Sequence, residues 1–252
     1  MTQFQPVHSK RVSDEVGAQI RRLLASRELK PGDKLPAERE LAVQLGVGRN
    51  SVREAFRGLE MAGVLRLVKG PKGGAFISRG STKVLSSGLR DLLHLRGATI
   101  DQITEARILI EESVTRLVCE RATENDFAAF EACLASAERA YAAGDYAAKL
   151  SHLIEFHNML ACATSNPVLI TVMAAIMTMM HDFGTAAGPE QNDLSLHALR
   201  KVVVKLRQRD EAAAVRAMAD HLSRLKDRYL RTQRLHEAGF RDAKVAPGEV
   251  EE

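Results

Sequence analysis

Residues 35–77 constrain the fold of this chain more than any other stretch, because they carry the local signals of a small helical domain in unbroken order. They read LPAERELAVQLGVGRNSVREAFRGLEMAGVLRLVKGPKGGAFI. Pro36 suits the first position of a helix, and the glycine that ends LAVQLG predicts a sharp turn after it. In the next helix, Val52, Phe56 and Leu59 recur at helical spacing and predict a buried face.

The second of these helices also has a basic face. Asn50, Arg53 and Arg57 recur on a side of the helix that is separate from the apolar stripe. Gly48 and Ser51 are alternative N-caps for this helix. A helix that is exposed and basic near its N-terminus can place arginine beside guanine edges and phosphates in the major groove.

A glycine-rich basic hairpin follows the two helices. Residues 65–67 and 75–77 predict short strands, and residues 68–74 form the turn, which carries Lys69 and Lys72. Each feature alone fits an ordinary surface helix or hairpin. Their order, however, is that of a winged helix-turn-helix, in which a helix enters the major groove and a wing lies beside it. The stretch therefore predicts binding to double-stranded DNA.

These residues resemble the N-terminal domain of the GntR family of bacterial transcription regulators, whose signature is LPxERxLA followed by GVxRxxVRxAxxxLxxxGL. The resemblance implies that Arg39, Arg49 and Arg53 contact bases and phosphates, and that Gly70 enters the minor groove at the wing tip. Gly48 departs from the hydroxyl residue usual in the family, which leaves the preferred base sequence open. The expected DNA-contacting residues are Arg39, Arg49, Asn50, Ser51, Arg53, Lys69, Gly70 and Lys72.

Positive charge is concentrated in the same region. Residues 10–79 hold 15 Lys and Arg against 8 Asp and Glu, whereas the whole chain has a net charge of only +4. The rest of the chain is therefore net negative. Such a distribution is expected when one domain carries the electrostatic footprint for nucleic acid.

Composition argues against several other classes of protein. No apolar run approaches the roughly 20 residues needed to span a bilayer, so no membrane partner is expected. The start, MTQFQPVHSK, lacks the apolar core of a secretory signal, and three widely spaced cysteines make no disulfide framework, which favours the cytoplasm. Three Tyr and no Trp leave few stacking platforms for single-stranded nucleic acid.

The pattern along the chain predicts a mainly α fold in five parts. They are a flexible segment (1–9), a winged helix-turn-helix domain of three helices and a small β-hairpin (10–79), a linker helix (80–98), an all-α helical-bundle sensor domain (99–236) and a disordered acidic tail (237–252). Within the bundle, helices are expected over residues 101–121, 123–142, 145–164, 167–183, 194–207 and 210–235.

The bundle resembles the ligand-sensing FCD domain of the FadR subfamily. Three matches carry the resemblance: EARILIE at 105–111, FHNMLACATSNPVL at 156–169 and RQRDEAAAVRAMADHL at 207–222. The resemblance implies a homodimer that binds an inverted-repeat operator. It also implies control by a small effector, such as an organic acid, a sugar acid or an acyl-CoA thioester. The expected function is thus a transcriptional repressor and not an enzyme.

Many such domains hold a divalent metal, zinc or nickel, between one Asp and three His. Here only His157 and His221 match, while Leu153 and Leu199 stand at the other two positions. His197, two residues before Leu199, or Glu155 would complete the site only if the alignment shifts. Two imidazoles without a carboxylate make a weak metal site. The favoured interpretation is that both histidines are hydrogen-bonded residues of a pocket.

The resemblance implies that Arg107, His157 and His221 bind the effector. Arg107 lies on an otherwise apolar helix, where a buried guanidinium needs an anionic partner. That partner is either the carboxylate of an organic acid or Glu111, one helical turn later. The sequence leaves both alternatives open.

Two other functions are consistent with parts of the sequence. A metal-dependent hydrolase would use His157, His181, Asp182 and His221, but the spaced carboxylates and the nucleophile–base pair that it needs are lacking. A nonspecific architectural protein would bind DNA with a steep salt dependence and little preference among sequences.

Overall fold

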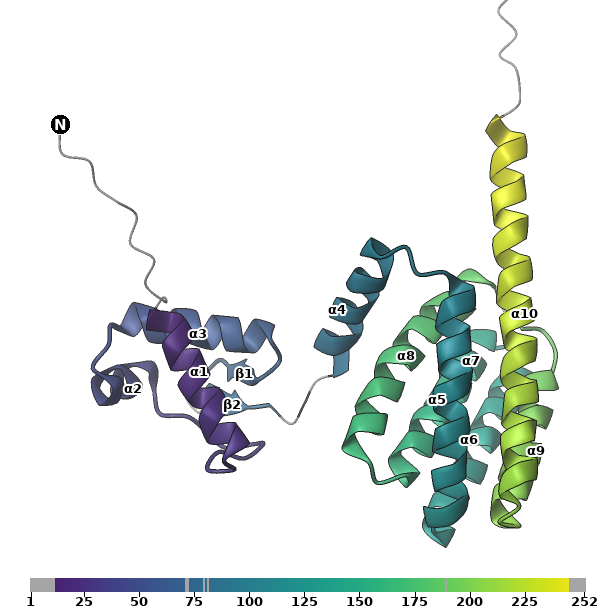
Figure 1. Ribbon diagram of the computed structural model, residues 1–252, viewed down its shortest axis with the longest axis horizontal. Coiled ribbons are helices and arrows are strands. Elements are labelled where there is room, and N and C mark those ends of the chain that lie inside the picture. Colours follow the sequence, from purple (N-terminus) through teal and green to yellow (C-terminus); the bar gives the residue numbers. More distant parts are fainter. Residues whose placement is uncertain (1–11, 71–72, 79, 81, 189, 245–252) are drawn as a thin grey trace, which may run out of the picture. The chain divides into compact units, whose positions relative to one another are not determined.

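The computed structural model describes residues 12–70, 73–78, 80, 82–188 and 190–244, and it divides into two compact units, residues 1–85 and 86–252. In chain order the elements are α1 (Val12–Ala25), α2 (Glu38–Leu45), α3 (Arg49–Met61), β1 (Leu65–Val68), β2 (Gly74–Ile77), α4 (Thr82–Leu95), α5 (Ile100–Arg121), α6 (Glu124–Ala142), α7 (Tyr146–Ala163), α8 (Pro167–Ala186), α9 (Leu194–Arg207) and α10 (Glu211–Lys244) (Figure 1). This is the mainly α fold that the sequence predicted.

In the first unit, α1 and α2 pack on α3, and β1 also contacts α3. The helical stripe of α3 forms the centre of the core, since Val52, Phe56 and Leu59 are at most 2% exposed. Leu65 and Ile77 add the apolar face of the hairpin to the same core. The predicted buried face of α3 is confirmed, and the opposite face is left for solvent.

One predicted helix start is wrong, and at another the structure selects one of two predicted N-caps. The N-cap of α2 is Ala37, so Pro36 lies before the helix and not at its first position. A glutamate three residues later closes this first turn, because its carboxylate accepts from the Ala37 N–H at 3.3 Å. Gly48, not Ser51, is the N-cap of α3. Gly46 has a φ of 64° at the end of α2, which produces the predicted sharp turn.

The hairpin is antiparallel, with Leu65 opposite Ile77 and Val68 opposite Gly74. Its turn is tightest at Gly73, where a Cβ atom would lie 2.1 Å from the carbonyl oxygen of Val68. That distance is far below any van der Waals contact, and the blocking atom belongs to the backbone. Only glycine fits this position.

Gly73→Ala should destabilise the hairpin by about 1–3 kcal/mol, because a backbone atom cannot rotate away from the new methyl group. Hydrogen exchange of β1 and β2, followed by mass spectrometry, should become faster. Gly58→Ala is the matched control: a Cβ there meets nothing within 4 Å, and alanine within α3 should stabilise the helix by up to about 1 kcal/mol. Unchanged exchange in Gly73→Ala would contradict this turn conformation.

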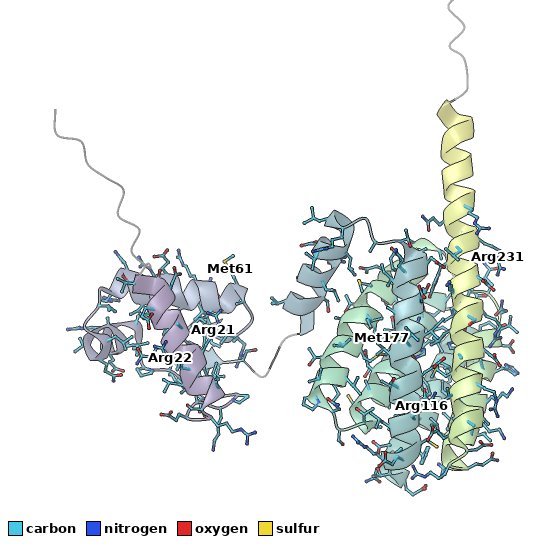
Figure 2. The ribbon with its side chains drawn as sticks, viewed as in Figure 1. Arg21, Arg22, Met61, Arg116, Met177 and Arg231 are labelled. Atoms are coloured by element: carbon cyan, nitrogen blue, oxygen red, sulfur yellow. The ribbon has the colours of Figure 1, made fainter. Side chains whose placement is uncertain are left out.

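The second unit is a bundle in which α6 packs on α7, α7 on α8, and α10 on both α5 and α9. Its interior holds large, fully buried side chains; they include Phe127, Phe130, Phe156, Met173, Met177 and Met180. Figure 2 shows Met177 inside this unit and Met61 of the first unit at the end of α3, where it is 80% exposed. Leu89 and Leu93 of α4 pack against the core of the bundle.

Helix caps in the second unit follow the sequence closely, except at the end of the chain. Thr99 and Thr123 each form the capping box that starts α5 or α6. α10, however, continues to Lys244, so the expected helix end near Leu235 is wrong. Gly239 is the one glycine in this extension, and a single glycine costs a helix only about 1 kcal/mol.

α8 corrects the expectation that no apolar stretch approaches membrane-spanning length. It is 20 residues long, and its length and composition would allow it to cross a bilayer. In the second unit, however, α8 packs on α7, and its Met173, Met177 and Met180 are fully buried in the core. The apolar composition of α8 is therefore explained by its place in the core of this unit.

Candidate functional site

α3 presents a polar face on the first unit. Arg49, Asn50, Arg53 and Arg57 are all exposed: Asn50, Arg53 and Arg57 lie on the face away from the buried stripe, and Arg49 is the first residue of the helix. A terminal nitrogen of Arg53 donates a hydrogen bond to Oδ1 of Asn50 at 2.8 Å. The bond orders two neighbouring side chains in the first turns of the helix, the part of a recognition helix that reaches base edges.

The other residues expected to contact DNA also belong to the first unit. Arg39 is exposed on α2, and Ser51 is half-buried on α3. Lys69 and Gly70 are exposed at the hairpin turn, where Gly70 has a φ of 108°. Lys72 lies outside the described residues.

Two further cations of the hairpin region were missed by the sequence analysis. The guanidinium of Arg66 lies 5.7 Å from the centroid of the Phe76 ring, and the ammonium of Lys34 lies 5.6 Å from it. Arg66 is opposite Phe76 in the antiparallel pair. Strand alternation was the available signal, because the residue after the buried Leu65 points to the other face of the hairpin.

The second unit contains a cavity of about 410 Å³, a size typical of small-molecule sites. α5, α7 and α10 supply Arg107, His157 and His221, the three residues expected to bind the effector, and all three line this cavity. Each side chain is almost completely buried. The fold therefore brings these three distant positions to one enclosed site.

A buried polar network links the three helices at this cavity. Nε of Arg107 donates to Oε1 of Glu111 at 2.6 Å, and Oε2 of the same carboxylate lies 2.6 Å from Nδ1 of His157. The His221 ring is nearly parallel to that of His157, with 5.8 Å between their centroids. Glu111 is therefore the protein partner of Arg107, although Arg107 also lines the cavity.

Burial and charge determine the protonation states in this network. Burial acts to raise the pKa of Glu111, but contact with His157 and Arg107 outweighs it and holds the pKa at about 2. Burial lowers the pKa of His157, with partial compensation by Glu111. Burial lowers the pKa of His221 much further, and His157 and Arg107 act in the same direction. At neutral pH the carboxylate is ionised, both imidazoles are neutral, and Nδ1 of His157 donates to Glu111.

The stability of the second unit should fall as the pH drops below about 6.5, because histidines of the unfolded chain then take up protons that the buried His157 and His221 do not. Each of the two histidines should lower the free energy of unfolding by up to about 1.4 kcal/mol per pH unit. Tyrosine fluorescence reports this unit alone, since Tyr141, Tyr146 and Tyr229 all lie in it. His221→Gln should remove about half of the slope, and an unchanged slope would contradict a neutral buried His221.

Another part of the cavity wall is held by a second buried cation, which the sequence analysis missed. Nζ of Lys149 donates to the backbone carbonyls of Asn192 and of Glu190, the latter at 3.0 Å. It also lies 3.4 Å from the Glu190 carboxylate, which accepts a hydrogen bond from Ser195. Arg228 donates to a carbonyl of the same α8–α9 connection at 2.6 Å. These bonds fasten the connection to the cavity wall.

The metal ligands implied by the family resemblance are not assembled. Leu153 lines the cavity, and Leu199 is fully buried in the core. His197, the alternative ligand, has a side chain that is 74% exposed. In the described parts of the chain, no three His, Cys, Asp or Glu side chains form a group that could hold a metal ion. His157 and His221 therefore lie in the cavity without the other ligands of the family.

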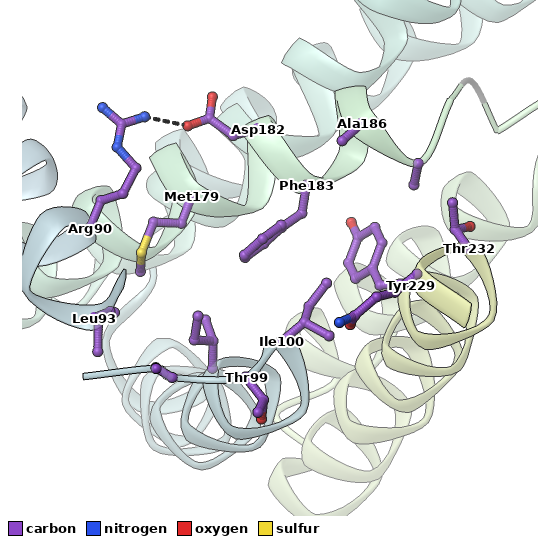
Figure 3. Close-up of a pocket in the computed structure, with 15 residues that line it drawn as sticks. Arg90, Leu93, Thr99, Ile100, Met179, Asp182, Phe183, Ala186, Tyr229 and Thr232 are labelled. Carbon is purple, nitrogen blue, oxygen red and sulfur yellow. Dashed lines mark hydrogen bonds and ion pairs between the residues drawn. The ribbon is translucent and has the colours of Figure 1, made fainter. Parts of the chain in front are cut away.

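A second cavity, of about 710 Å³, is lined by residues of α4, α5, α8 and α10. Figure 3 shows Asp182 of α8 bound to Arg90 of α4 at a distance of 2.6 Å, which ties these two helices together. Asp182 lines this cavity, whereas His157 and His221 line the first one. The residues proposed for a hydrolase are thus not brought together, and that alternative is wrong.

Tyr229 is the side chain that the two cavities share. Figure 3 shows it in the wall of the second cavity; it also lines the first cavity and is only 4% exposed. Burial raises the pKa of its hydroxyl, and the nearby Arg107 and Arg228 partly oppose this effect. Tyr229 therefore connects the surroundings of Arg107 with the cavity beneath α4.

Both units match known families. Residues 12–77 match the model for bacterial regulatory proteins of the gntR family, and residues 102–224 match the FCD domain model. The HTH-type transcriptional repressor NanR of Cronobacter sakazakii is 30% identical over 231 residues, which are 87% of this chain and 85% of the relative. NanR of Salmonella newport is equally similar. A solved structure of Streptococcus agalactiae GntR aligns with a TM-score of 0.65 at 29% identity, and covers 85% of this chain and 99% of that one.

Proposed function

The chain belongs to the GntR family of bacterial transcription regulators and carries an FCD domain, and on this premise we propose that it is a sequence-specific transcriptional repressor. Its first unit binds double-stranded DNA, and a small effector in the second unit controls the affinity for the operator. The seven helices α4–α10 support assignment to the FadR subfamily, in which a linker helix precedes the sensor bundle.

The observation that carries this proposal is the exposed polar face of α3. A helix whose apolar side is buried and which exposes Arg49 in its first turn and Arg53 on its polar face fits the major groove, where arginine pairs with guanine O6 and N7. Arg39 adds a cation from α2, while Lys69 and Gly70 form a wing suited to the neighbouring minor groove.

We further propose that the protein acts as a homodimer, with each protomer bound to one half of an inverted repeat. The effector is a small organic acid or acyl-CoA-type molecule in the 410 Å³ cavity. Its anionic group binds Arg107, and the adjoining part of the molecule contacts His157 and His221. A coupling free energy of about 1–3 kcal/mol between the two sites is enough for regulation. Tyr229 and the Arg90–Asp182 pair offer a route from this cavity to α4.

Selection of bound duplexes from a random pool, with the full-length protein, tests the proposed function. The expected result is enrichment of one short inverted repeat, whose half-sites are spaced for the two DNA-binding units of a dimer. Enrichment of a single half-site would contradict the dimeric arrangement. Binding without any enriched sequence, together with a steep salt dependence, would instead favour the nonspecific architectural protein.

A further inference from the structure

We propose that the effector cavity of this chain works without a metal ion, and that the buried guanidinium of Arg107 supplies the fixed positive charge there. The role of the effector rests on the proposed function, whereas the absence of a metal requirement concerns the cavity itself. Three features of the cavity support this proposal: the side chains at the expected ligand positions, the hydrogen bonds that the remaining polar atoms already make, and the cations already present.

The first feature is that two of the four positions that bind the metal in the family hold hydrocarbon side chains in this chain. Leu153 is 8% exposed and lines the cavity one helical turn before His157. Leu199 is fully buried within the apolar core of the bundle. Neither side chain has a lone pair to donate, and zinc sites in proteins require three or four ligands.

The second feature is that the nearest carboxylate is already used. Both oxygens of Glu111 are committed, one to Nε of Arg107 and the other to Nδ1 of His157, each at 2.6 Å. A metal ion would have to break one of these bonds and leave a buried cation or imidazole without its partner. The described residues then offer two neutral imidazoles and no anionic ligand, a set that binds Zn²⁺ or Ni²⁺ weakly.

The third feature is the cations that the cavity already contains. Arg107, Lys149 and Arg228 all line it, while its carboxylates are occupied: Glu190 holds Lys149, and Asp145 accepts from the first turn of α7. A divalent cation beside a buried guanidinium would be repelled in this low-dielectric site. The guanidinium of Arg107 attracts an organic anion in the cavity that it lines, where Glu111 bonds its Nε and the Tyr229 hydroxyl is a further hydrogen-bonding neighbour.

This arrangement predicts what kind of effector the cavity accepts. Where a metal holds the ligand, the ligand needs two oxygens placed to chelate it. A guanidinium needs only one carboxylate, which it can bind through two parallel N–H groups. The cavity should therefore bind monocarboxylates that lack a chelating second oxygen, and EDTA should leave its ligand binding unchanged.

The test is the metal content and metal response of the full-length protein. Protein produced in medium supplemented with Zn²⁺ and Ni²⁺ should contain far less than one equivalent of either metal. Neither these ions nor EDTA should shift its tyrosine-monitored melting temperature. A stoichiometric metal that EDTA removes, with a fall in melting temperature, would overturn the proposal. Neither measurement involves DNA, so this result is independent of the selection experiment.

A gain-of-function variant identifies the missing ligand. Leu153→Asp places a carboxylate one turn before His157 and should raise the affinity for Zn²⁺ by more than about tenfold. Leu150→Asp is the matched control, because it adds the same charge to the same cavity wall about two turns from His157. Equal Zn²⁺ affinity in the two folded variants would contradict the assignment of Leu153 as the lost ligand position.

Discussion

Replacing Arg49 and Arg53 together with alanine should weaken binding to the selected operator between about 30-fold and 25,000-fold. Each arginine that reads a base edge contributes about 1–3 kcal/mol of discrimination, so the pair accounts for about 2–6 kcal/mol. Both side chains are exposed, so the core of the first unit, including Val52 and Phe56, should remain intact. Fluorescence anisotropy of a labelled operator at one fixed salt concentration measures the loss.

The double variant Arg21→Ala/Arg22→Ala is the matched control for that loss. Both arginines are exposed on α1 of the same unit (Figure 2), and their removal changes the net charge by the same amount. Binding to DNA depends on general electrostatics, so this control should lose affinity only a few-fold. Equal losses in the two double variants would mean that affinity follows net charge and not the surface of α3.

The exposed polar face of α3 could be predicted from the sequence because its determinants are local. Val52 and Phe56 lie one helical turn apart, and Asn50, Arg53 and Arg57 recur at helical spacing on another side of α3. The periodicity of a single helix therefore separates the buried face from the exposed one. Helix ends were less certain, since Ala37 and Gly48 have no side-chain oxygen to mark an N-cap.

The 410 Å³ cavity could be predicted only in part, because most of its contacts join separate helices. The pair Arg107–Glu111 lies within one helical turn and could be considered from the sequence alone. The second bond of that carboxylate, to His157, joins α5 to α7. The Lys149–Glu190 contact likewise joins α7 to the α8–α9 connection. No spacing along the chain reports such contacts, so the family resemblance identified His157 without identifying Glu111 as its partner.

Glu111→Ala should destabilise the second unit by about 3–5 kcal/mol, because it leaves the buried Arg107 without a counter-charge. Urea unfolding followed by tyrosine fluorescence measures this loss in the second unit alone. Glu120→Ala, an exposed position on the same helix α5, is the control and should change stability by no more than about 0.5 kcal/mol. Equal stability of the two variants would contradict the buried ion pair.

The pH dependence of the Glu111→Ala effect provides a separate check on its cause. Because the pKa of Glu111 is lowered to about 2 in the folded protein, its ionisation stabilises the fold above pH 4.5 and loses this effect as the pH falls toward 2. A shift of that size corresponds to about 3 kcal/mol, comparable with the predicted loss. The difference between the parent protein and the variant should therefore narrow below about pH 4.5.

Replacing both partners distinguishes the loss of charge balance from the loss of packing. In Arg107→Met/Glu111→Leu the interior keeps its volume and contains no unpaired charge, so most of the stability lost in Glu111→Ala should return. If the double variant is as unstable as Glu111→Ala, the stability of this unit depends on the bond between the Glu111 carboxylate and His157, and not only on the balance of charge with Arg107. If stability returns, the ion pair is not required for folding, and its retention is explained by the cation that it holds in the cavity for an anionic effector.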